Sequence, residues 1–247
     1  MIHYWKADCI RILKRVPRLI VTILLLLIYA GVLCYTSTKT GWNSVKFLEF
    51  ISFEIVVAPP LFGTVELIFV YGDDMKAKTM QQAIGRGLSR GQVLGTKILE
   101  LAAVSLVDLV VLGTMQQLIG LATGIRLKNG QPLELFAYYC SIWIAMMAYG
   151  MLAGLATSLI RNAALGACIY LALSLSLVSG LLQVLFNMSF VKNLHLSNYL
   201  LTSCINMLQA QLIVNRFAAG SALGIVIYLV IAYILALRIF KHKELEL

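Results

Sequence analysis

Four carboxylates inside long apolar stretches are the side chains of this sequence best placed to do chemistry. Glu54, Glu66, Glu100 and Asp108 all lie within hydrophobic runs. A charged Asp at the centre of a membrane helix costs about 2.5–3.5 kcal/mol on insertion scales. Each carboxylate therefore needs either a partner on a neighbouring helix or a function that maintains it.

Two of these carboxylates are predicted to lie deep in the membrane. Asp108 lies well inside the third apolar run, and Glu54 lies just before Pro59 and Pro60. Because proline has no N–H, the carbonyls freed near Glu54 could line a polar cavity beside the carboxylate. Both carboxylates fit a site for a substrate cation or a proton, and both fit a structural group satisfied by neighbouring helices. The candidate residues of a substrate pathway are Glu54, Pro59, Pro60, Glu66 and Asp108.

The other two carboxylates, Glu66 and Glu100, lie near the ends of their runs. We expect them to pair with Lys97, Arg90 or the polar segment 71–97. No combination of residues typical of an enzyme accompanies them. The motif H-E-x-x-H is absent, no Ser-His-Asp set is suggested, and the five cysteines include no C-x-x-C. We predict no catalytic residue and no metal site.

The composition determines the class of protein. The 247 residues are 60% hydrophobic and 13% charged, and the mean hydropathy is +0.88. A soluble domain carries about 25% charged residues, so the chain is predicted to be an integral membrane protein. The net charge of +9 is better explained by basic cytoplasmic loops than by nucleic-acid binding, since no basic groove or aromatic-basic module is present.

The apolar runs predict an all-α protein with six transmembrane helices and one domain, 1–247. Each run is near the ~20 residues needed to cross a bilayer. Residues 1–17 have helical amphipathic spacing and are predicted to form an interfacial helix that Pro17 ends, although a plain basic flank is the alternative. Segment 188–216, before the last span, is predicted to hold one or two short external helices. The predicted spans are 18–36, 48–70, 96–122, 133–158, 164–187 and 217–238.

The distribution of basic residues predicts the orientation. With the N-terminus inside, fourteen Lys and Arg residues fall in cytoplasmic segments and six in external ones. The excess of positive charge inside places both termini in the cytoplasm.

The longest polar stretch, 71–97, lies between the second and third spans. Asp73 or Asp74, or Thr79 with Gln82, could cap a short helix whose apolar side is Met80, Ala83, Ile84 and Leu88. Gly85 and Gly87 could end it, and Ser89 with Gln92 predicts a capping box at the start of the next helix. The sequences GRGLSR and GQVLGTK fit neither phosphate-binding glycine motif. A solvated loop or a docking helix for a cytoplasmic partner remains.

This topology and segment resemble the ABC transporter type 2 permease family. In that family a polar segment after the second span contains a Thr, a short helix, then P-x-S-R and a Lys that opens the third span. Thr79, Ser89, Arg90 and Lys97 match, whereas Gly87-Leu88 replaces the usual proline. The likeness covers nearly the whole chain in topology and about twenty residues in motif.

The resemblance implies a membrane subunit of an ATP-driven exporter, without an ATPase site of its own. ATP and Mg would be bound by a separate cytoplasmic ATPase, which would bind a coupling helix of the permease. Two identical or related permease copies would form the pathway in a bacterial plasma membrane. The residues expected to couple to the ATPase are Lys78, Thr79, Met80, Gln81, Gln82, Ala83, Ile84, Arg86, Leu88, Ser89 and Arg90.

The substrate class is open at this stage. Amphipathic, antimicrobial or toxin peptides fit the few charges of the pathway, and lipids or hydrophobic drugs fit it equally. A non-transporting membrane scaffold or sensor subunit is the alternative from another class. Three G-x-x-x-G pairs, which begin at Gly120, Gly150 and Gly220, predict close helix contacts either within one subunit or at a dimer seam.

Overall fold

The computed structural model describes residues 2–40, 43–77, 79–128, 130–160, 162–186, 196–213 and 219–242, and within these it is helical with no strand. Five helices are long and apolar enough to cross a membrane, or six if one bent pair counts as a span. The predicted all-α class is confirmed, and the coarse prediction of a multi-pass membrane protein agrees with these helices.

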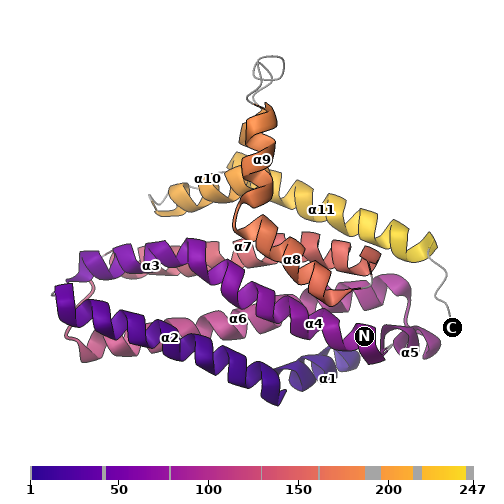
Figure 1. Ribbon diagram of the computed structural model, residues 1–247, viewed down its shortest axis with the longest axis horizontal. Coiled ribbons are helices and arrows are strands. Elements are labelled where there is room, and N and C mark those ends of the chain that lie inside the picture. Colours follow the sequence, from indigo (N-terminus) through magenta and orange to yellow (C-terminus); the bar gives the residue numbers. More distant parts are fainter. Residues whose placement is uncertain are drawn as a thin grey trace.

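Five of the six predicted spans coincide with these helices, which run side by side along the long axis of the bundle (Figure 1). They are α2 (Val16–Thr40), α3 (Ser44–Ala58) continued by α4 (Thr64–Ala77), α6 (Arg90–Ala122), α7 (Gln131–Ile160) and α11 (Ala219–His242). Most ends of these helices lie a few residues outside the predicted limits, because helical pairing continues past the apolar run; α6 ends at the predicted residue, and α11 starts two residues inside its limit.

Between α3 and α4 the helix widens into a π-helical turn, η1 (Pro59–Gly63). Pro59 and Pro60 cannot donate the usual backbone hydrogen bonds, so the regular ladder is interrupted there. The prediction that this proline pair disturbs the second span is confirmed. The chain nevertheless stays helical from Ser44 to Ala77.

The predicted fifth span, 164–187, is not one continuous helix. It is divided into α8 (Ala163–Ser174) and α9 (Leu177–Phe186), which meet at 55°, and α9 stands out from the bundle (Figure 1). Ser176 between them has a left-handed φ of 59°. The hydroxyls of Ser174 and Ser179 bond to backbone carbonyls one turn earlier, which weakens the helical preference of this serine-rich stretch.

The N-terminal helix α1 (Ile2–Leu13) is present, but Pro17 does not end it. Instead α1 stops at Leu13, and Pro17 lies in the first turn of α2, where its missing N–H has no helical partner to lose. The short α5 (Thr79–Gly85) and α10 (Leu201–Ile213) occur where short helices were predicted. The helix α1, the helix α5 and the C-terminal end of α11 lie at the same end of the bundle (Figure 1).

Both glycines of one G-x-x-x-G pair pack inside this chain, whereas each of the other two pairs has one packed glycine, Gly120 beside Phe47 and Gly224 beside Cys204. A Cβ added to Gly150 would lie 2.4 Å from the Leu101 side chain on α6, and one added to Gly154 would lie 2.4 Å from the Tyr71 hydroxyl on α4. The same addition at Gly220 meets nothing within 4 Å. The pair on α7 therefore brings α6 and α4 close to α7, and the dimer-seam interpretation does not apply to it.

Candidate functional site

One face of α6 carries a series of buried polar side chains. All of them are buried, so they lie on the side of α6 that faces the bundle. The residues of this α6 stripe are Lys97, Glu100, Ser105, Asp108 and Gln116. The described partners of its charged and amide members on other helices come from α1, α2, α3 and α7, so these polar groups link α6 to four neighbouring helices.

The first group on the stripe is an ion-pair cluster that ties α1 to α6. The Lys97 ammonium donates to Asp8 at 2.7 Å and to Glu100 at 2.5 Å, and Arg11 pairs with Asp8 at 2.5 Å. Burial, together with the charges of Glu100 and Asp8, raises the pKa of Cys9 in α1 to about 11. The predicted Lys97–Glu100 pair is confirmed, and Asp8 is a partner that sequence reasoning missed.

The second group joins α2, α4 and α6. The Arg18 guanidinium donates to the Asp108 carboxylate at 2.6 Å, and both side chains are buried. The carboxylate of Glu66 is fully buried, and Arg18 and Asp108 are the charged groups that act on it. Neither of its oxygens has a hydrogen-bond partner among the described residues.

These contacts change two predictions. Arg18 was counted as a basic cytoplasmic residue, but only 2% of it is exposed, so it is an internal counter-ion and not an orienting charge. Glu66 was expected to pair with Lys97, Arg90 or the polar segment, whereas the charges that act on it are those of Arg18 and Asp108. For Asp108, the structural interpretation of a carboxylate satisfied by a neighbouring helix is the one that the geometry supports.

The third group surrounds Glu54 and contains only neutral partners. Both Glu54 oxygens accept from the amide nitrogen of Gln116, at 2.6 and 2.7 Å, and the Tyr139 hydroxyl donates to the Gln116 carbonyl oxygen. Glu54 is 1% exposed, and no ion pair links it to a cation within the described ranges. A buried carboxylate without a cation is costly to keep.

The carbonyls of the two prolines accept hydrogen bonds from side chains. The Tyr170 hydroxyl donates to the carbonyl of Pro59 at 3.1 Å, and the Thr64 hydroxyl donates to that of Pro60 at 2.5 Å. Both prolines are buried. The carbonyls that the missing proline N–H groups leave free lie one turn earlier, in α3, so the expectation that they line a polar cavity beside Glu54 stays a prediction.

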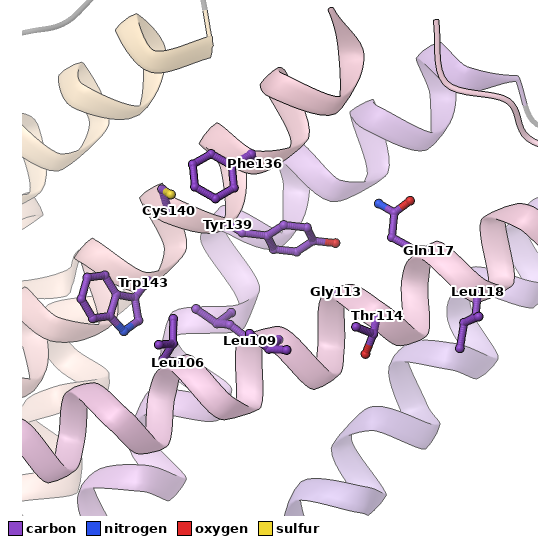
Figure 2. A pocket seen from close by; sticks show the side chains of 11 residues that line it. Leu106, Leu109, Gly113, Thr114, Gln117, Leu118, Phe136, Tyr139, Cys140 and Trp143 are labelled. Carbon is purple, nitrogen blue, oxygen red and sulfur yellow. The ribbon is translucent and has the colours of Figure 1, made fainter.

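A cavity of about 660 Å³ lies between α6 and α7. Figure 2 shows the aromatic rings of Phe136, Tyr139 and Trp143 along its α7 wall and Gly113 on α6. None of the five predicted pathway residues lines it. Tyr139, however, belongs both to this wall and to the hydrogen-bonded chain that ends at Glu54, so the cavity and the buried carboxylate are two hydrogen bonds apart.

The predicted junction between the polar segment and α6 is confirmed. Gly87 has a φ of +93°, and the N–H groups of Gly87 and Leu88 return to Ile84 and Ala83, which closes the end of α5. Ser89 and Gln92 form the predicted capping box. The two elements are thus joined by a turn with defined hydrogen bonds.

Among the predicted coupling residues, Gln82 and Arg86 are exposed, while Ala83 is 4% exposed and packs within the chain. Ala83 is therefore closed to a partner, whereas Ile84 and Leu88 of the predicted apolar side are half-buried. Lys78 lies outside the described residues, as do the side chains of Thr79, Met80 and Gln81.

Neither a protein-family model nor a curated protein matches this sequence. The site must therefore be interpreted from its own residues. Sequence reasoning missed Arg18, Gln116 and Tyr139 as partners of the buried carboxylates. A signal for one of them was present, because Gln116 follows Asp108 at a helical interval on an otherwise apolar run.

Proposed function

We propose that this chain is the membrane subunit of an ATP-driven exporter, similar to ABC transporter type 2 permeases, which forms the substrate pathway and is powered by a separate cytoplasmic ATPase. The observation that carries the proposal is the α5–α6 junction, a short helix held to a spanning helix by a glycine turn and a capping box. Such a junction can transmit a force from a partner, because it has few freely rotating bonds.

The ion pairs of α6 support a route for that force. A displacement of α5 would move the start of α6, where Lys97 holds α1 through Asp8. Further along, Asp108 holds α2 through Arg18. In this mechanism, closure of the ATPase displaces α5, and α5 displaces α6. Because the ion pairs hold α1 and α2 to α6, the three helices move together in a rigid-body transition between two packed states. The bend between α8 and α9 is a second element that can repack.

The exposed face of α5 directs the test. In the double variant Ile84→Asp plus Arg86→Glu, a half-buried apolar side chain and an exposed cation are both replaced by acids. We expect this variant to lose co-purification of an ATPase subunit and ATP hydrolysis in the complex, while the protein remains folded in detergent. Arg126→Glu is the matched control, because it makes the same charge reversal in the exposed loop at the opposite end of α6.

The outcome also separates the proposal from a scaffold or sensor subunit. A transporter subunit must stimulate ATP hydrolysis or depend on it. Undiminished ATPase binding in the double variant, or labelling that locates α5 on the external side of the membrane, would refute the coupling role. An ATPase that binds but whose hydrolysis is unaffected by the permease would favour the scaffold.

A further inference from the structure

Glu54 differs from Glu66, Glu100 and Asp108, because no cation among the described residues pairs with it or acts on it. Asp108 has Arg18 at 2.6 Å, Glu100 has Lys97 at 2.5 Å, and Glu66 is acted on by the carboxylate of Asp108 and by the cation of Arg18. Glu54 has an amide on both oxygens, and a phenol behind that amide. An uncompensated carboxylate that is 99% buried is a place where a cation would be stabilised.

The route to this carboxylate begins at the cavity between α6 and α7. The Tyr139 ring covers Gly113, where an added Cβ would lie 3.2 Å from the ring. Figure 2 shows the Tyr139 side chain reaching from α7 towards α6, with its hydroxyl directed away from the Trp143 end of the cavity. Its hydroxyl contacts Gln116, which holds Glu54. A rotation of Tyr139, together with a shift of the Gln116 amide that it contacts, would therefore connect the cavity with the carboxylate.

The cavity itself suits a hydrocarbon group. Its wall consists mainly of Leu, Val and aromatic side chains, with Thr114 and Gln117 towards one end (Figure 2). Its volume of about 660 Å³ lies in the range of sites for small molecules, about 300–1,000 Å³. An anionic lipid headgroup would be repelled by Glu54, whereas an amine or guanidinium attached to an apolar body would complement both parts.

We infer that the α6–α7 cavity binds a cationic amphipath, with the apolar part between Phe136 and Trp143 and the positive group paired with Glu54 after Tyr139 moves aside. This inference names the substrate class of the proposed exporter. The transport of the ligand rests on the proposed function, whereas the binding of the ligand does not. Binding itself requires no ATPase.

Tryptophan fluorescence provides the test, because Trp143 lines the cavity. The other two tryptophans are removed by Trp5→Phe and Trp42→Phe, and the full chain is purified in an uncharged maltoside detergent. The probes are 11-bromoundecyltrimethylammonium and the neutral 11-bromoundecanol, whose bromine quenches a tryptophan in contact. We expect saturable quenching by both probes. The cationic probe should reach half-saturation at a concentration at least about tenfold below that of the neutral probe, because an ion pair with a buried group contributes more binding free energy than a neutral contact.

Glu54→Gln should remove this preference and leave quenching by the neutral probe unchanged. If Glu54→Gln does not fold, Gln116→Lys places an internal cation beside Glu54 and should give the same loss. Asp108→Asn is the control at a carboxylate that already has a cation, and should retain the preference.

Equal quenching by the two probes in the otherwise wild-type protein would overturn the inference and identify the cavity as a site for uncharged acyl chains. A preference that survives in a folded Glu54→Gln or Gln116→Lys protein would also overturn it. These measurements involve the permease alone, so their outcome is independent of the ATPase tests. If the protein binds an ATPase but shows no preference for the cationic probe, the proposed exporter function stands and the inferred substrate class is refuted.

Discussion

The two segments of α6 hold buried carboxylates in opposite ways. In the paired segment, 97–108, Lys97 and Arg18 neutralise Glu100 and Asp108, and α6 lies close to α7 where Leu101 meets Gly150. In the open segment, 109–118, Gln116 is the neutral partner of Glu54, and most of the α6 residues that line the cavity belong to this segment. The paired segment has the features of a rigid support, and the open segment has those of a binding site.

The largest expected effect is at the centre of the paired segment. Lys97→Met leaves Asp8 and Glu100 without their shared ammonium, and breaking a buried ion pair costs about 3–5 kcal/mol. We expect this loss in the free energy of unfolding, measured by SDS titration in mixed maltoside micelles. Lys128→Met, at an exposed loop position, is the control and should change little. A stability equal to that of the wild type would show that the cluster does not support the fold.

The next effect compares the carboxylates of the two segments directly. Asp108→Asn removes the charged acceptor of buried Arg18 and should cost about 1–3 kcal/mol. Glu54→Gln replaces a carboxylate that has no cation, and we expect it to change the free energy of unfolding by less than about 1 kcal/mol in either direction. The same SDS titration measures both. If Glu54→Gln were as damaging as Asp108→Asn, the distinction between the two segments would fail.

A smaller effect tests how closely the helices pack. Gly150→Ala would place a methyl group 2.4 Å from Leu101, and overpacking of this kind costs about 1–3 kcal/mol. Gly113→Ala in the open segment meets the Tyr139 ring at 3.2 Å, and the ring has the cavity beside it, so a small shift relieves the contact. We expect a melting temperature in maltoside that falls for Gly150→Ala and stays nearly constant for Gly113→Ala. Gly220→Ala, which meets no atom, is a neutral control.

The elements of this fold were predictable where one local signal decided them. Five spans followed from long apolar runs, and the capping box at Ser89 followed from the spacing to Gln92. The break at Ser176 was not predicted, because no proline or glycine lies between α8 and α9 and the left-handed residue is a serine. The competition of serine hydroxyls for the backbone is a weaker signal than an apolar run.

The candidate site was predictable only in part, because its contacts join residues far apart in the chain. The cost of burying a carboxylate identified Glu54 and Asp108 as important, but it could not show that Arg18, ninety residues before Asp108, would neutralise one and not the other. Arg18 follows a proline at the start of a span, where sequence reasoning places a cytoplasmic charge. Only the tertiary packing turns it inward.

The smallest effect concerns Cys9 in α1, whose pKa responds to the charges of the Lys97 cluster. Its pKa is raised to about 11, so at pH 9 about one thiol in a hundred is the reactive thiolate. In a single-cysteine protein, we expect the rate of alkylation by iodoacetamide to rise through pH 9 and 10 and level off only near 11. The Lys97 ammonium lowers this pKa while Glu100 and Asp8 raise it, so Lys97→Met should slow alkylation further at every pH below 11, whereas Lys128→Met should not. Faster alkylation in Lys97→Met would mean that α1 has separated from α6, and the paired segment would then depend on this one ammonium for its contact with α1.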